Sequence, residues 1–108
     1  MSNPIENGSV FSAADSIEYS SNSVVSKTIV KKPAGNITLF SFDAGEGLAE
    51  HSSPHEAFVS ILDGVAEITI DGKNQEVHKG ESIILPANLP HALKANQAFK
   101  MLLVMIKS

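Results

Sequence analysis

The stretch Gly47-Leu-Ala-Glu-His51-Ser-Ser-Pro-His55-Glu56-Ala-Phe-Val-Ser-Ile-Leu-Asp-Gly64 decides how the chain is organised. Its first half is polar and is broken by Pro54. Its second half is apolar and β-prone, and it ends at the turn signal Asp63-Gly64. Two imidazoles and a carboxylate therefore stand at the entrance of a predicted strand. Ligand-type side chains in such a place indicate a binding site.

A second junction of the same kind lies further along the chain. There Ile83-Ile84-Leu85-Pro86 leads into Asn88-Leu-Pro-His91, which again puts a histidine where a loop meets an apolar strand. Two matching junctions favour one shared pocket, to which both segments contribute.

The remaining segments are short, apolar and separated by turn residues, as in an antiparallel β-sandwich or barrel. Asp71-Gly72 is the strongest hairpin signal in the chain. One helical turn is predicted over Ser12–Ile17, with Ser12 as N-cap and Asp15 in a capping-box position. The predicted strands are Val24–Lys31, Ile37–Phe42, Ala57–Leu62, Val65–Ile70, Gln75–Val77, Ser82–Leu85, His91–Lys94 and Phe99–Ile106. We therefore expect an N-terminal arm over residues 1–22 and an all-β domain over residues 23–108.

The composition excludes several classes of function. The chain has 108 residues, a net charge of −4 and no cysteine, so thiolate metal sites and cysteine nucleophiles are ruled out. Its eight basic residues are all lysine and are scattered, which disfavours specific nucleic-acid binding. No Gly-x-Ser-x-Gly or phosphate-binding glycine loop occurs, so no nucleotide cofactor is expected. Without a signal-like or membrane-spanning apolar run, we expect a soluble, cytoplasmic protein that contacts no membrane.

Two strands are apolar on both faces, which predicts self-association. In Ala57–Leu62 the alternation turns Phe58 and Leu62 outward, and Phe99–Ile106 is apolar on both sides apart from Lys100. Apolar patches of more than a few hundred Å2 are rarely left exposed on monomers. We therefore expect a homodimer built on these strands.

These residues resemble the cupins, a family of small barrels with two short motifs on either side of a hairpin. The resemblance covers Phe40 to Ile106 and implies a jelly-roll barrel, in particular a small single-domain bacterial cupin. The positions that match the two motifs are Gly45, His51 and Gly64 in the first and Gly80, Pro86 and His91 in the second. Asn88 replaces a usual glycine, which asparagine can do because it tolerates positive φ.

The resemblance implies a divalent metal at the barrel mouth, but with an incomplete ligand set. A common metal-binding form of the first motif reads His-Ser-His-Pro-His-Glu-Glu, so Ser53 and Ala57 stand at two of the four usual ligand positions. His51 and His91 carry over as ligands. His55 is either a third ligand or an exposed loop residue, since strand parity is unreliable across a proline.

Three interpretations remain open at this stage, and the third of them is a purely structural dimer with a vestigial pocket. The first is a small-molecule-binding barrel with a metal on His51, His91 and His55, capable of oxygenase, isomerase or lyase-type chemistry, with catalysis undecided. The second is a metal-free, non-enzymatic binding or sensing module whose histidines hydrogen-bond a polar ligand. In either case Ser53, Phe42 and Met101 are candidates for lining the pocket, although the aromatic residues of a small barrel also serve as core.

Overall fold

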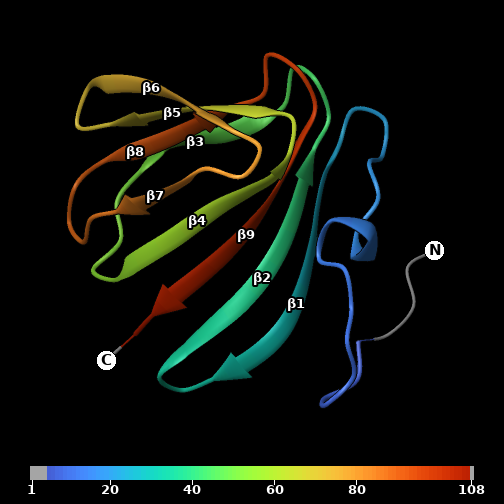
Figure 1. The fold of residues 1–108 in the computed structure, drawn as a ribbon. Helices are drawn as coiled ribbons and strands as arrows, with labels where there is room; N and C mark the ends of the chain where they lie inside the picture. The colour runs from blue at the N-terminus through green and yellow to red at the C-terminus, as the bar shows by residue number, and fades with distance from the viewer. Residues whose placement is uncertain (1–4, 108) are drawn as a thin grey trace.

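The computed structural model describes residues 5–107, and nearly all of its regular structure is β-strand (Figure 1). Its elements are η1 (Ala14–Ser16), β1 (Val24–Lys32), β2 (Gly35–Phe42), β3 (Gly47–His51), β4 (Glu56–Asp63), β5 (Val65–Ile70), β6 (Lys73–His78), β7 (Ser82–Leu85), β8 (His91–Lys94) and β9 (Phe99–Ile106). Within the described residues, no helix has the length and apolar character needed to cross a bilayer.

The strands form two antiparallel sheets that face each other. The larger sheet has the order β1-β2-β9-β4-β7, and the smaller has the order β3-β8-β5-β6. The inward faces of both sheets supply the core, in which the rings of Phe42 and Phe99 stack with their centroids 4.5 Å apart. This arrangement confirms the predicted all-β, antiparallel jelly-roll barrel.

The predicted alternation in β4 is confirmed. Ala57, Val59 and Ile61 are buried, whereas Phe58 keeps 37% of its surface exposed. The register then fixes the faces of β9, because residues directly opposite each other in a ladder share a face. Met101 lies opposite Ile61, and Met105 lies opposite Ala57, so both methionines point into the barrel.

Two local predictions were wrong. The N-terminal helical turn is a three-residue 3-10 turn that follows Ala13, and no side chain caps it, so Ser12 is not an N-cap. Instead, the Ser12 carbonyl accepts a 2.6 Å hydrogen bond from Ser16 Oγ, because hydroxyl side chains compete for nearby backbone groups. In addition, β3 was missed. Its sequence lacks β-branched residues, and it pairs with β8 through an irregular register.

The N-terminal arm lies against the outer face of the larger sheet. Ile17 is buried there, and Ser41 Oγ on β2 donates a 2.8 Å hydrogen bond to the Glu18 carbonyl. Lys100 Nζ on β9 donates to the Ala14 carbonyl at 2.6 Å. Tyr19 donates its hydroxyl hydrogen to Asp63 Oδ2, and partial burial together with this carboxylate raises the pKa of the Tyr19 phenol. The arm is thus tied to the barrel near the start of β9.

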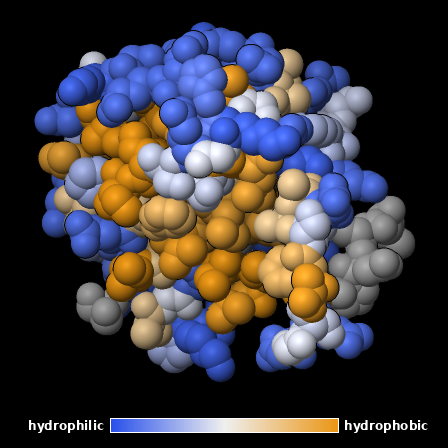
Figure 2. Space-filling view, in the orientation of Figure 1, coloured by the Kyte–Doolittle hydropathy of each residue, from blue (hydrophilic) through white to orange (hydrophobic). Residues whose placement is uncertain are grey.

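An apolar row crosses this outer face, and the arm lies beside its β1–β2 end, where Ile5 and Phe11 line a hollow together with Val30 and Ile37. The residues that the register places side by side are Val30 on β1, Ile37 on β2, Val104 on β9, Phe58 on β4 and Ile84 on β7. Ile84 is 52% exposed, and Ile106, next to the row on β9, is 53% exposed. Figure 2 shows hydrophobic side chains gathered over the region where Figure 1 places β2, β9 and β4. The structure thus adds Ile84 and Ile37 to the apolar surface expected from the sequence.

Candidate functional site

Two histidines from separate strands meet at one end of the barrel. His51 is the last residue of β3 and His91 is the first of β8, and the register places them opposite each other. Their ring centroids are 4.4 Å apart, and the ring planes make an angle of 67°. The two junctions singled out in the sequence therefore contribute to one place, as expected.

Backbone carbonyls fix the orientation of both rings. His51 Nδ1 lies 2.8 Å from the Ala49 carbonyl oxygen, and His91 Nδ1 lies 3.3 Å from that of Leu89. Because a carbonyl oxygen can only accept, each Nδ1 must carry the hydrogen in these bonds. In the neutral rings the lone pair is then on Nε2, which is the tautomer of a histidine prepared to bind a metal or accept a hydrogen bond.

The environment of His91 favours its neutral form. The side chain is buried, with 7% of the residue exposed, and the His51 ring lies beside it. Burial and, secondarily, repulsion from a charged His51 lower the pKa of His91, and the bond to Leu89 offsets only part of this. A neutral imidazole is the form that can use its Nε2 lone pair.

We expect the lowered pKa of His91 to be measurable in the metal-free protein. An NMR titration of the imidazole C–H resonances should give His91 a lower pKa than the same residue has in the urea-unfolded chain. As pH falls below about 6.5, the unfolded chain binds this proton before the folded chain does. The free energy of unfolding should therefore decrease with falling pH until the pKa of His91 in the folded chain is reached. A native pKa at or above the unfolded value would contradict the burial argument.

A cavity of about 60 Å3 lies directly beneath the two rings. Its polar wall contains His51, His91, His55 and Ser53, and its apolar wall is formed by Leu48, Ala57, Leu85, Leu93, Met101, Leu103 and Met105. His51, Ser53, His55 and Ala57 therefore share this wall in spite of Pro54. Phe42 is not among the lining residues, because it is fully buried against Phe99 in the core.

Backbone hydrogen bonds hold the two site loops together. The Asn88 N–H donates to the Ser53 carbonyl at 2.7 Å, which joins the loop before β4 to the loop before β8. Asn88 adopts φ +69°, as predicted for this replacement of glycine. The Ser53 hydroxyl oxygen accepts a 3.1 Å hydrogen bond from the His55 N–H, which closes the turn around Pro54.

The donor set suits a metal only in part. No group of three His, Cys, Asp or Glu side chains able to hold a metal ion occurs within residues 5–107. Glu56 is exposed and lies opposite Ile106 on the outer face, while Ala57 takes the inward position. The imidazoles of His51 and His91 could fill two places in a coordination sphere. Further ligands would have to come from other cavity residues or from the bound molecule.

Sequence reasoning missed several residues of the cavity wall. Leu48 belongs to the unpredicted strand β3, and Leu93 projects inward from β8, so neither could be assigned to the site from motifs. Met105 could have been found, because it has the same parity on β9 as Met101.

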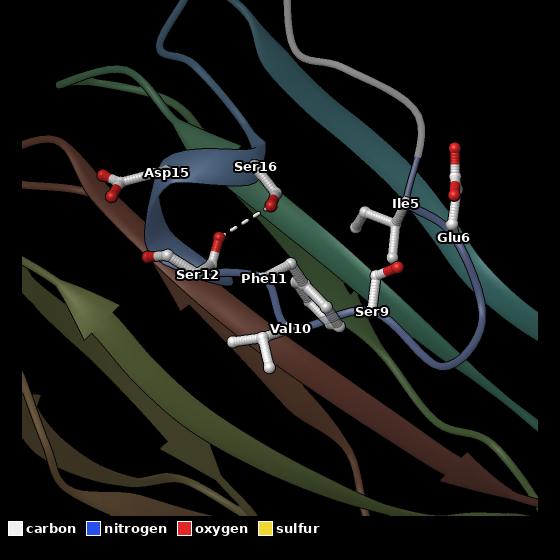
Figure 3. A pocket seen from close by; sticks show the side chains of 8 residues that line it. All are labelled: Ile5, Glu6, Ser9, Val10, Phe11, Ser12, Asp15 and Ser16. Atoms are coloured by element: carbon white, nitrogen blue, oxygen red, sulfur yellow. Dashed lines mark hydrogen bonds between the residues drawn. The ribbon is translucent and has the colours of Figure 1, made fainter.

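Larger hollows lie along the N-terminal arm, away from the histidines. Figure 3 shows one of about 310 Å3, around Ser9, Phe11 and Asp15. Its drawn residues all come from the arm, and Figure 3 shows no imidazole among them. Its shape comes from the arm crossing the sheet, and we assign it no chemistry.

The jelly roll, with paired histidines from its first and second motifs, matches a known family. The family model of the Cupin domain matches residues 38–107 of the chain. The chain belongs to the cupin family. Comparison with curated proteins gives no match.

Solved cupin structures resemble the chain over most of its length. A conserved protein of unknown function from Streptococcus pyogenes is 42% identical, with a TM-score of 0.91, and the match covers 98% of this chain and 93% of that one. A cupin superfamily protein from Desulfitobacterium hafniense is 27% identical, with a TM-score of 0.90, and the match covers 100% of this chain and 99% of that one. Salicylate 1,2-dioxygenase from Pseudoaminobacter salicylatoxidans shares the fold at 16% identity and a TM-score of 0.72, over 77% of this cupin and 26% of that enzyme.

Proposed function

We propose that this cupin binds a small molecule at the mouth of its barrel through a divalent metal held by His51 and His91. The observation that carries the proposal is the pair of rings 4.4 Å apart, each with its Nδ1–H directed to a backbone carbonyl. In the neutral rings this leaves the Nε2 lone pair of each histidine free of these carbonyl bonds. Nitrogen donors of this kind suit zinc, nickel, copper or iron better than magnesium or calcium.

The cavity has room for a metal ion but not for an organic ligand, so the two would occupy different places. About 60 Å3 corresponds to roughly two water molecules, so a metal with coordinated water would fill it. An organic ligand then has to approach from the exposed side of His51, above the rings. A metal there would act as a Lewis acid on an oxygen of the bound molecule. The Ser53 hydroxyl can donate a hydrogen bond to the same molecule, and the apolar wall excludes water below it.

A metal titration tests the proposal. The chelator-treated protein should take up one Zn2+ per chain, and His51→Ala should remove most of this binding. His91→Gln should do the same, and it keeps the volume of the buried ring so that folding is preserved. His78→Ala is the matched control, because His78 is exposed on β6 and lies outside the cavity. Equal zinc affinity in the unaltered chain and in all three variants would overturn the proposal.

His55 can be assigned in the same titration. It lines the cavity and is half-buried, so a ligand role predicts that His55→Ala weakens zinc binding by at least about tenfold. If its affinity equals that of His78→Ala, His55 is a wall residue and the metal is held by two histidines and the ligand.

The alternative function is a metal-free binding or sensing module. It is favoured by the incomplete donor set, since the position of the family's glutamate is occupied by Ala57 and the carboxylate of Glu56 lies outside. In this case the two Nε2 atoms accept hydrogen bonds directly from a polar ligand. Absence of zinc uptake together with retained binding of a small hydroxylated molecule in a ligand screen would select this function.

We also propose that the cupin is a homodimer that associates through the apolar row on the outer face of the larger sheet. The row crosses all five strands of that sheet, and three of its members, Val30, Phe58 and Ile84, keep more than a third of their surface exposed. We further propose residues 1–22 as the arm and residues 23–108 as the barrel domain, of which residues 1–4 and 108 lie outside the described part. A cytoplasmic location and the lack of nucleic-acid and membrane partners stay predictions.

A further inference from the structure

We propose that Asn7 is a site of spontaneous deamidation, and that the carboxylate formed there weakens the contact of the N-terminal arm with the larger sheet. The reaction needs only water as a co-reactant. It is independent of the histidines and of the proposed metal function.

Asn7 is followed by the residue that hinders this reaction least. Among the asparagines of the chain, only Asn7 precedes a glycine. Deamidation begins when the backbone nitrogen of the next residue attacks the side-chain carbonyl carbon of asparagine, and a side chain on that next residue obstructs the approach. Glycine has no side chain and allows the backbone the widest range of conformations. The sequence therefore favours Asn7 over every other asparagine.

The turn that contains Asn7 is open to solvent. The Ser9 N–H donates a 3.3 Å hydrogen bond to the Glu6 carbonyl, and Gly8 has φ +84° at the third position of this turn (Figure 3). Type II turns require positive φ at that position, which glycine adopts without strain. Asn7 and Gly8 are both exposed, and beyond the chain neighbours of Gly8 no described atom lies within 4 Å of where its Cβ would be. Water and hydroxide can therefore reach both reacting groups.

No hydrogen bond holds the Asn7 amide in place. Within residues 5–107 its side chain has no hydrogen-bond partner. The side-chain amides of Asn74 and Asn96, by contrast, both donate to the carboxylate of Glu67. To turn toward the next backbone nitrogen, those two amides would have to give up a charge-assisted hydrogen bond, whereas the Asn7 amide gives up none.

The reaction exchanges an amide for a carboxylate. The Gly8 nitrogen loses its proton and forms a bond to the side-chain carbonyl carbon of Asn7, and the side-chain nitrogen leaves as ammonia. Water then opens the resulting cyclic imide at either of its two carbonyls. The products are aspartate and isoaspartate, in which the main chain runs through the former side chain. One water is consumed for each ammonia released, and the net charge becomes one unit more negative.

The new charge lies where the arm meets the larger sheet. Asn7 and Gly8 line a hollow together with Val30 and Ile37, which belong to the apolar row. Glu6 lines the same hollow, and no lysine does so within the described residues. The product therefore adds a second carboxylate beside Glu6, against an apolar wall and without a compensating cation, which should weaken the contact of the arm.

Peptide mass mapping of the aged full-length protein tests the modification site. The chain is incubated in mildly alkaline buffer, digested at acidic pH and sequenced by fragmentation in the mass spectrometer. We expect Asn7 to lose its amide at least about tenfold faster than Asn22, an exposed asparagine followed by serine, or Asn96. The rate should rise with pH, because the Gly8 nitrogen must lose its proton. Asn7→Gln is the matched control, since it keeps the amide but would need a larger ring.

The same samples show by which route the amide is lost. An isoaspartate-specific methyltransferase should label the aged unaltered chain at residue 7 and should not label Asn7→Gln there. Equal rates of amide loss at Asn7, Asn22 and Asn96 would overturn the modification site. Aspartate without isoaspartate would overturn the cyclic route through Gly8.

Limited proteolysis tests the effect on the arm. Phe11 lines the same hollow, so chymotrypsin can cut after it only when the arm moves away from the sheet. Cleavage should be at least about threefold faster in Asn7→Asp than in the unaltered chain. Gln97→Glu is the control, because it adds the same charge outside the arm. Equal cleavage rates in all three proteins would overturn the weakened contact.

Discussion

A Phe58→Glu variant is expected to be a monomer at micromolar concentrations at which, by our proposal, the unaltered cupin is a dimer. Phe58 lies between Val104 and Ile84 in the apolar row and is 37% exposed, so a glutamate there is tolerated in the monomer. In the dimer the carboxylate would be buried against Val104 and Ile84 without a partner charge. Burying an unpaired ion costs several kcal/mol, so the dissociation constant should rise by about a thousandfold or more.

The charges beside the apolar row are consistent with a second copy as its partner. Lys32 on β1 and Glu56 on β4 lie in the neighbouring row of the same sheet, separated by Gly35 and Ile106. A two-fold axis along the strands reverses the strand order of one sheet over the other. In a dimer with this axis, Lys32 of one copy would come close to Glu56 of the other, twice in each dimer. An isologous interface of this kind is closed, and it is the commonest form of self-association.

Sedimentation or light scattering over a range of concentrations measures the expected dissociation of the Phe58→Glu variant. Gln97→Glu is the control, because it adds the same charge to an exposed loop between β8 and β9 and should stay dimeric. If the unaltered chain keeps a monomer mass as its concentration rises and binds no hydrophobic dye, the arm covers enough of the sheet and the dimer proposal is wrong.

An Ala57→Glu variant is expected to bind zinc at least about tenfold more tightly than the unaltered chain. Ala57 is buried, lines the cavity and occupies the inward position where a common form of the first motif has glutamate. A carboxylate there would join the two imidazoles as a charged third ligand, which is a typical zinc donor set. Without metal, the same carboxylate would be buried next to apolar side chains and should lower the free energy of unfolding. Zinc should restore the free energy of unfolding, since a ligand that binds only the native state stabilises that state.

Thermal unfolding with and without zinc distinguishes this effect from simple overpacking. Ala57→Gln has nearly the same volume and no charge, so it should share the loss of stability without the recovery. If both variants respond equally to zinc, the new side chain does not reach the metal.

The sequence was most informative where alternation was regular and turns were specific. Strand β4 and the face of β9 followed from period-two patterns, and the Asp71-Gly72 turn has positive φ at both residues. Strand β3 could not be predicted, because its five residues include glycine, alanine and glutamate, and its pairing with β8 is irregular. Tertiary contacts hold it in the sheet where local preference does not.

The structure brings together the polar residues that the sequence singled out, but most of the apolar wall of the cavity and its geometry were not predicted. The pairing of His51 with His91 followed from the motifs, whereas the inward position of His55 depends on the turn around Pro54, which Ser53 closes. Phe42 was expected near the ligand because an aromatic side chain suits both pocket and core. Its position opposite Phe99 in the register placed it in the core, and that register is a long-range property.

The position of β9 has a consequence for a chain that is still being synthesised. Among the strands of the described residues, β9 emerges last, yet it lies at the centre of the larger sheet, between β2 and β4. Until residue 106 is available, β2 and β4 have no partner on their inner edges, and Phe99 and Met101 are missing from the core. Strands with unpaired edges and exposed apolar surface are prone to aggregate. Folding of this barrel is therefore expected to wait until β9 has emerged, and until then a chaperone has the exposed edges of β2 and β4 to protect.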